Sequence, residues 1–506
     1  MSRQERRRNE WEARKRKKQE NRSVLREQRE VEGLAHPVSA TLPNGKSPFG
    51  SVEEERDARQ EAVIEQQRVF QVFLPKLLRK LKKIPDPRNP QKTKHKLTIV
   101  LLLGILNFVY QMASRREANR RMTRPVFVEN LRQFFPDLEA LPHQDTLARL
   151  LSVIEVDQIE TLHLDMLREL IRKKKFSRYL IDDCYPIAID GTQKMARSEW
   201  VTVEWLEREL KTTGGVKKQY YVYVLEANLV FQNCMVIPVM SEFLNYAEGD
   251  TEKDKQDCEQ KAFHRLAERL KKAFPRLSVM VLLDGLYPNG PILERCRKNN
   301  WQYMIVLQDG SLPSVLEEFQ GLKTLQVNHQ HNRVWGNRWQ SFRWVNGIEY
   351  EWGPNGCKQC QVHLVVCREN WEEVDKQADQ IVTKDSKHAW LSSKPLNRNN
   401  IHERCNLGAR HRWGIESGIL VEKRHGYQYE HAFSHNWNAM KGYHFLMRLG
   451  HTLNVLAHFS GALAKRVREM GVRGLIDFVR ETMAGPWFDP VETQKRLAAP
   501  FQLRLE

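Results

Sequence analysis

Cysteine is scarce in this chain, with eight residues among 506. A disulfide framework is therefore not indicated, and the charged N-terminus does not resemble a signal peptide, so we expect a reducing, cytoplasmic location. Cys357 and Cys360 form one C-x-x-C pair, with Cys367 and Cys405 further on. No second C-x-x-C or H-x₃-H follows at zinc-finger spacing. We expect thiols in a hairpin turn rather than a structural Zn²⁺, a choice that metal analysis would decide.

Long apolar runs are scarce as well. The stretch from Leu97 to Ala113 carries no charge, but its seventeen residues reach only the lower limit for a membrane-spanning helix. Gly104, Asn107 and Gln111 interrupt it, and basic residues flank both of its ends. We therefore expect a buried helix of a soluble helical domain, and no membrane partner.

Acidic residues are outnumbered by basic ones, with 63 Asp and Glu against 81 Lys and Arg and a formal net charge of +18. Such an excess favours a polyanionic partner. Nucleic acid is favoured over an acidic membrane, because basic side chains gain free energy by releasing counterions from phosphates. An ordinary soluble basic protein is the alternative.

The apolar pattern changes along the chain and divides it into segments that are long enough for two or more domains. Helical spacing, β-rich runs and amphipathic helices alternate in an order typical of a mixed α/β sheet. No helix-turn-helix signature is present, so we assign DNA binding to the N-terminal part from charge and order alone. The predicted segments are a basic charged tract and linker (1–69), an all-helical, DNA-binding domain (70–178), the first part of an α/β core (179–310), a β-rich insertion (311–399), the helices that complete the core (400–470) and a C-terminal tail (471–506).

Two aspartates stand where predicted core strands end, Asp190 in "AIDGT" and Asp284 in "LLDGL". Open α/β sheets bind ligands at this edge, although Asp-Gly is also a common turn. Neighbouring carboxylates repel each other and favour a divalent cation, and a pair of Mg²⁺ ions suits in-line phosphoryl transfer. Such a site needs a third carboxylate from another element. Asp182 and Asp183, just before the first strand, are interpreted as loop residues that compete weakly with Asp190.

A third acid, Glu416, lies in "HRWGIESGILVEKRHGY" after the predicted insertion. Arg412, Glu416 and Lys423 follow one another at steps of four and seven, which places them near one face of a predicted helix. The alternative is an ordinary i,i+4 ion pair with a solvated lysine. His431 and His435 lie further on in a polar stretch, and we interpret them as capping or DNA-facing residues rather than metal ligands.

Taken together, these motifs resemble those of bacterial insertion-sequence DDE transposases, close to the IS4-like and H-repeat-associated groups. The resemblance spans roughly residues 83–460. One departure is Ala409, which stands where the family pattern has a tyrosine ahead of the arginine. The resemblance implies an α/β, RNase H-like core with a β-rich insertion, preceded by an all-helical domain. The segments that carry it are "PDPRNPQKTKHKLTIVLLLGIL", "LPHQDTLARLL", "AIDGTQK", "LLDGLYPNGP" and "RWGIESGILVEK".

The resemblance also implies roles for individual residues. Asp190, Asp284 and Glu416 become a triad that holds two Mg²⁺ (or Mn²⁺) ions, and Arg412 and Lys423 become contacts to DNA phosphates. The implied protein binds terminal inverted repeats as a homodimer, cleaves the DNA and joins it to target DNA, in a bacterial cytoplasm at the nucleoid. The alternatives are an inactive, transposase-derived DNA-binding protein and an RNase H-like nuclease without strand transfer.

Overall fold

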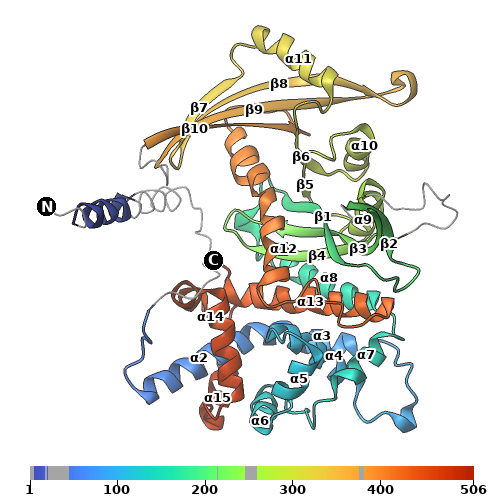
Figure 1. Cartoon of the computed structure of the whole chain (residues 1–506), viewed down its shortest axis with the longest axis vertical. Helices are drawn as coiled ribbons and strands as arrows, with labels where there is room; N and C mark the ends of the chain where they lie inside the picture. The colour runs from blue at the N-terminus through green and yellow to red at the C-terminus, as the bar shows by residue number, and fades with distance from the viewer. Residues whose placement is uncertain (1–4, 18–19, 21–44, 213–214, 246–258, 375–380) are drawn as a thin grey trace.

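The computed structural model contains the mixed α/β arrangement expected from the apolar pattern. Figure 1 shows helices from both ends of the chain at one end, a large mixed sheet in the middle and long antiparallel strands at the other end. The structure describes residues 5–17, 20, 45–212, 215–245, 259–374 and 381–506.

The N-terminal helices include residues 97–109 of the charge-free stretch. They form α4, whose residues are buried except Ile99, and no helix in the described part of the chain is long and apolar enough to cross a membrane. Helix α2 begins at Val52, inside the segment predicted as tract and linker, because Ser51 caps it and three glutamates occupy its first turn. These helices are α2 (Val52–Gln71), α3 (Leu74–Leu81), α4 (Leu97–Val109), α5 (Arg115–Met122), α6 (Pro125–Phe134), α7 (Gln144–Leu151) and α8 (Asp157–Arg172), with the short η1 (Pro90–Lys92) and η2 (Ser177–Tyr179).

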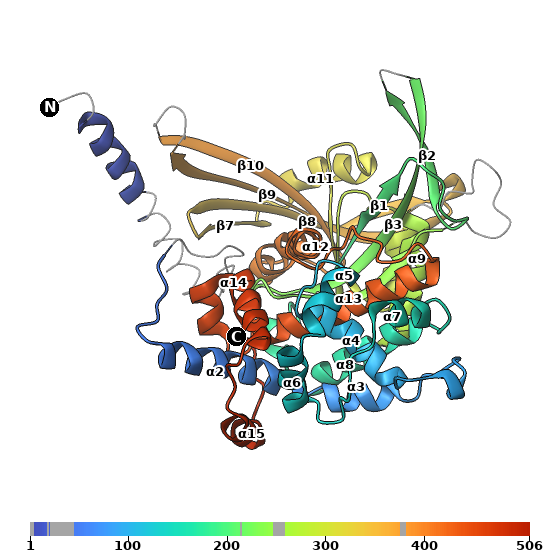
Figure 2. The same ribbon diagram turned by 60° about the horizontal axis from the view of Figure 1, so that its bottom comes forward.

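The C-terminal helices complete the same helical layer. Helix α13 (Trp437–His458) packs on α4, α7 and α8, while α14 (Ala464–Ala484) and α15 (Pro490–Ala498) pack on α2 and α6. Figure 2 shows them against the N-terminal helices. The predicted C-terminal tail is therefore wrong for most of its length, since apolar residues such as Leu475 and Val479 are buried there.

The core strands form a mixed sheet. On one side of β1, β3 pairs antiparallel with β1 and β4 pairs antiparallel with β3. On the other side, β5 pairs in parallel with β1 and β6 pairs in parallel with β5. The strands are β1 (Tyr185–Arg197), β2 (Leu206–Thr212), β3 (Gly215–Val230), β4 (Val236–Phe243), β5 (Val279–Leu283) and β6 (Gln302–Val306), with helices α9 (Glu259–Ala273) and α10 (Gly290–Lys298) between them along the chain.

The predicted insertion continues the core sheet. Its last strand pairs with β6 over three residues, Trp390 to Ser392, so that one ten-stranded sheet runs through both parts. The insertion also contains a helix, α11, that the prediction of a β-rich segment did not include. Its elements are α11 (Pro313–Leu325), β7 (Gln330–Trp335), β8 (Arg338–Trp352), η3 (Pro354–Gly356), β9 (Lys358–Val374) and β10 (Ile381–Ser392).

The segment that follows the insertion is wound in three ways. A π-helical stretch η4 (His402–Gly408) and a 3₁₀ stretch η5 (Ala409–Trp413) precede α12 (Gly414–Arg424). The backbone leaves helical values at Gly408, with φ −98° and ψ −84°. The prediction of one regular helix carrying Arg412, Glu416 and Lys423 is therefore wrong for Arg412, which lies on η5.

Candidate active site

Asp190 and Asp284 lie side by side on neighbouring strands. β1 pairs in parallel with β5 from Tyr185 opposite Val279 to Ala188 opposite Leu282, and the same register extended by two residues places Asp190 level with Asp284. Asp284 directly follows β5, and its carboxylate accepts the Leu286 N–H at 2.9 Å. Asp190 does not end its strand as predicted, because β3 continues to pair with β1 beyond it. Both carboxylates nevertheless lie where the β1–β5 pairing ends.

Glu416 reaches this edge from the first turn of α12. The helix packs on β1, β3 and β4. Gly418 permits that contact, since a Cβ there would lie 2.7 Å from the Val236 side chain. Glu416 accepts a hydrogen bond from Arg412 Nη2 at 3.0 Å, which is the i,i+4 pair that the spacing allowed.

The acids influence one another's ionisation. Burial raises the pKa of Asp190 to about 7; the Arg412 guanidinium opposes this, while Glu416, Glu259 and Asp284 add to it. The three predicted carboxylates are thus close enough to disfavour a charge on Asp190. The edge concentrates negative charge that a cation would relieve.

Glu259 is a fourth acid that sequence reasoning missed. It begins α9, and its two oxygens accept hydrogen bonds from the hydroxyls of Tyr223 (3.2 Å) and Tyr287 (2.6 Å). Gly191 makes room for it, because a Cβ there would lie 2.4 Å from Glu259 Oε2. By strand alternation Gly191 faces the side of β1 opposite to Asp190. The glycine in "AIDGT" was the available signal of this close approach.

Arg412 is turned toward the acids. It is buried (6% exposed), and besides the pair with Glu416 its Nε and Nη1 atoms have no hydrogen-bond partner among the described residues. Its guanidinium also lies 5.1 Å from the centroid of the exposed Trp413 ring. In this structure Arg412 balances the charge of Asp190 and Glu416 rather than facing the open surface.

Lys423 ties α12 to the strand that carries Asp190. Its Nζ donates to the Gln193 carbonyl at 3.1 Å and forms an ion pair with Glu430 at 3.2 Å. The side chain is 19% exposed, so part of it remains accessible. Lys423 is thus placed beside the acids, three residues along β1 from Asp190.

A buried ionic network lies beneath α12. Arg448 of α13 forms ion pairs with Glu422 of α12 (3.1 Å) and Glu226 of β3 (3.2 Å). His451 contacts Glu422 at 2.7 Å. Although burial raises the pKa of Glu226, Arg448 and His444 hold it down, at about 2. These charges join β3, α12 and α13 at one point.

The donor chemistry of the acidic edge fits a hard divalent cation such as Mg²⁺ or Mn²⁺, which prefers carboxylate oxygens. In the part of the chain that the structure describes, no three His, Cys, Asp or Glu side chains are already arranged to hold a metal ion. Glu416 is engaged by Arg412 and Glu259 by two tyrosines. Arg412 engages only Oε1 of Glu416, so Oε2 of that carboxylate is the oxygen that could bind a cation without loss of this pair.

The other sequence candidates lie elsewhere. Asp182 and Asp183 both have positive φ in a turn, and Asp182 pairs with Arg404 at 2.6 Å. His431 packs against the ring of Phe433. The cysteines at positions 357, 360, 367 and 405 are free thiols, of which Cys357 is exposed.

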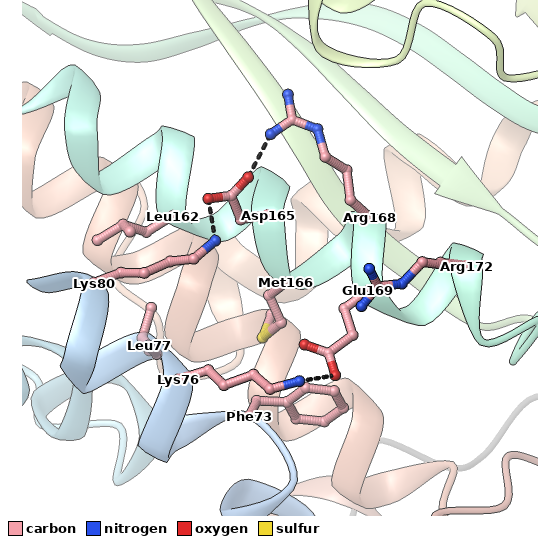
Figure 3. A pocket seen from close by; sticks show the side chains of 10 residues that line it. All are labelled: Phe73, Lys76, Leu77, Lys80, Leu162, Asp165, Met166, Arg168, Glu169 and Arg172. Atoms are coloured by element: carbon pink, nitrogen blue, oxygen red, sulfur yellow. Dashed lines mark hydrogen bonds and ion pairs between the residues drawn. The ribbon is translucent and has the colours of Figure 1, made fainter.

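A hollow between α3 and α8 is another candidate for a binding site. Figure 3 shows it lined by Lys76 and Lys80 from α3 and by Asp165 and Glu169 from α8. Ion pairs cross it, between Lys76 and Glu169 at 2.6 Å and between Lys80 and Asp165. Since these acids are already neutralised, the hollow is a helix–helix junction rather than a catalytic site.

The fold and the site define a class, a mixed α/β protein with acids gathered at one edge of its sheet. The family model described as DDE_Tnp_1-associated matches residues 78–166, from α3 into α8. This match indicates a relation to DDE-type transposases in particular. No curated protein matches the chain.

Proposed function

We propose that this chain is a DNA transposase of the IS4-like or H-repeat-associated kind, with an RNase H-like core. The observation that carries the proposal is the approach of Asp190, Asp284 and Glu416, from β1, β5 and α12, which helps to raise the pKa of Asp190 to about 7. The order β4-β3-β1-β5-β6, antiparallel and then parallel, supports the RNase H-like assignment. The match to residues 78–166 supports the transposase class.

The three acids would hold two Mg²⁺ or Mn²⁺ ions, which supply an activated water and neutralise phosphate charge. Water attacks the phosphorus at the end of the transposon, and the P–O3′ bond that breaks leaves a 3′-hydroxyl. That hydroxyl then attacks a phosphodiester of target DNA and displaces another 3′-oxygen. Arg412 balances the acids' charge before DNA arrives, and Lys423 fixes α12 against β1. The chain would act on terminal inverted repeats as a homodimer in the bacterial cytoplasm.

Substitution of the acids tests this function. Asp190→Ala, Asp284→Ala and Glu416→Ala should each reduce cleavage of DNA carrying the proposed terminal inverted repeats by about a thousandfold or more, because the metal site is lost. Binding of the same DNA should remain. Asp309→Ala is the matched control, since Asp309 is an exposed acid that follows the next parallel strand, β6.

The proposal fails for any acid whose alanine variant still cleaves at a near wild-type rate in Mg²⁺. Strand transfer of a pre-cut end separates a transposase from a nuclease that only cuts. A protein that binds the repeats but neither cuts nor joins them is the inactive DNA-binding derivative.

A further inference from the structure

A two-stranded arm projects from the sheet beyond the acidic edge. It consists of β2 and the first seven residues of β3, Gly215 to Tyr221, which pair antiparallel. Figure 2 shows this arm (green, labelled β2) extending away from the other elements. β1 leads from Asp190 to the base of the arm, where Ala196 and Arg197 pair with Tyr221 and Tyr220. The arm therefore points in the direction in which the β1–β5 pairing ends.

The charges of the arm differ between its two faces. Directly opposed residues of an antiparallel pair share a face, so Arg208 and Gln219 lie with Leu210 and Lys217 on one side. We call this the cationic face, because both charged residues on it are basic. The other face is balanced and carries Glu207, Glu209, Lys211 and Lys218, with Glu207 and Lys218 3.9 Å apart.

The arginine of the cationic face is held in place. Arg208 donates to Gln219 Oε1 from Nε (2.8 Å) and Nη2 (2.6 Å), and Nη2 also donates to Gln193 Oε1 at 2.7 Å. Its guanidinium stacks on the Tyr221 ring, 4.7 Å from the centroid. Arg208 is nevertheless exposed. A fixed, exposed guanidinium is well suited to a phosphate group.

Gln193 joins the arm to the catalytic edge. Its side chain accepts from Arg208, while its backbone carbonyl accepts from Lys423. Gln193 lies three residues after Asp190, which corresponds to about 10 Å along a strand. By strand alternation the Gln193 side chain lies on the same side of β1 as Gly191, so the cationic face approaches the acidic edge from the side of Glu259 and α9. Edge strands often carry charges that prevent aggregation, but that role does not require basic residues alone on one face.

We propose that the cationic face of the β2–β3 arm binds the phosphate backbone of duplex DNA beside the acidic edge. This inference rests on the proposed function, from which DNA is taken as the substrate. The net charge of +18 and a β-ribbon narrow enough for the major groove favour this partner over an acidic protein. A second copy of the chain is the competing occupant.

A charge-reversal pair on each face tests the inference. Binding of a short, labelled duplex of arbitrary sequence is measured with EDTA at several salt concentrations. Arg208→Glu with Lys217→Glu should weaken binding by about tenfold or more and make the plot of log affinity against log salt shallower by about 2. Lys211→Glu with Lys218→Glu, on the balanced face, changes the net charge equally and should have a much smaller effect.

Equal losses from the two pairs, or no loss from the first, would overturn the inference. A first pair that lowers the oligomeric state but leaves DNA binding unchanged would assign the arm to a second copy instead. Far-UV circular dichroism verifies folding of both exposed variants. Since binding is measured without metal, it is independent of cleavage. If the first pair loses DNA binding but the wild-type protein neither cleaves nor joins DNA, the inference about the arm holds and the proposed transposase function fails. If the wild-type protein cleaves and joins DNA but the first pair binds it normally, the function holds and the inference about the arm fails.

Discussion

At the scale of single residues, Asp190 carries a cost that its function would explain. An aspartate in an unfolded chain releases its proton near pH 4, whereas burial and neighbouring acids hold the pKa of Asp190 at about 7. Between these values the folded state binds more protons than the unfolded state. The contribution of Asp190 to the free energy of unfolding therefore falls as the pH rises from about 4 to 7, and it stays reduced above pH 7.

Replacement of this carboxylate should remove the penalty. In metal-free protein, Asp190→Asn should raise the free energy of unfolding at pH 8 by about 1–4 kcal/mol relative to wild type, and change it little at pH 4. Thermal unfolding in EDTA at both pH values measures this. Asp309→Asn is the control at an exposed acid. A stabilisation that is the same at both pH values would contradict the ionisation argument.

At the scale of elements, the placement of Glu416 depends on how α12 is anchored. Glu422, six residues further along the helix, is buried against Arg448 and His451. Arg448 also donates to Asn228 of β3 at 2.5 Å. Removal of one member of a buried ion pair leaves its partner's charge unpaired, which is more costly than removing both.

Arg448→Met should therefore destabilise the protein by about 3–5 kcal/mol, and Glu422→Gln in the same chain should recover part of that loss. Because the anchor positions α12 rather than contacting DNA, both variants should bind DNA normally but cleave it more slowly at temperatures where they remain folded. Arg448→Lys should keep the charge without the paired hydrogen bonds and have an intermediate effect. If DNA binding falls in parallel with cleavage, the effect is general loss of structure.

The same elements show what could be predicted from sequence. Continuous apolar runs predicted the strands next to Asp190 and Asp284, since buried parallel strands need them. Glu259 itself could not be predicted, because it begins a helix whose other acid, Glu268, faces solvent, and Gly191 signals only that some group approaches closely. Arg448 and Glu422 are 26 residues apart, and only the tertiary structure pairs them. The sequence offered one indication of this pair, the charged Arg448 within the largely apolar α13, because a buried arginine requires a partner.

At the scale of the whole molecule, the predicted segments are joined rather than separate. The insertion continues the core sheet through β10 and β6, and Arg410 of η5 pairs with the buried Glu369 of β9 at 2.5 Å. Helix α13 faces the core network on one side and packs on α4, α7 and α8 on the other. Helix α13 thus connects the buried ionic network beneath α12 to the N-terminal helices. Sequence order hides this, because α13 lies more than 250 residues after α8.

The predicted helical domain, residues 70–178, should consequently not fold alone. Twelve of the thirteen residues of α4 are buried, and α13 supplies part of that cover, with Gly450 lying against Phe108. Without α13 this apolar surface is exposed to water, at a cost of about 25 cal/mol for each Å². The isolated fragment should bind a hydrophobic dye and lack a near-UV circular dichroism signal, while the full chain should show one coincident unfolding transition for its helices and tryptophans. A fragment that unfolds cooperatively by itself would make the N-terminal helices an independent domain, and α13 would then be a docked helix rather than part of their core.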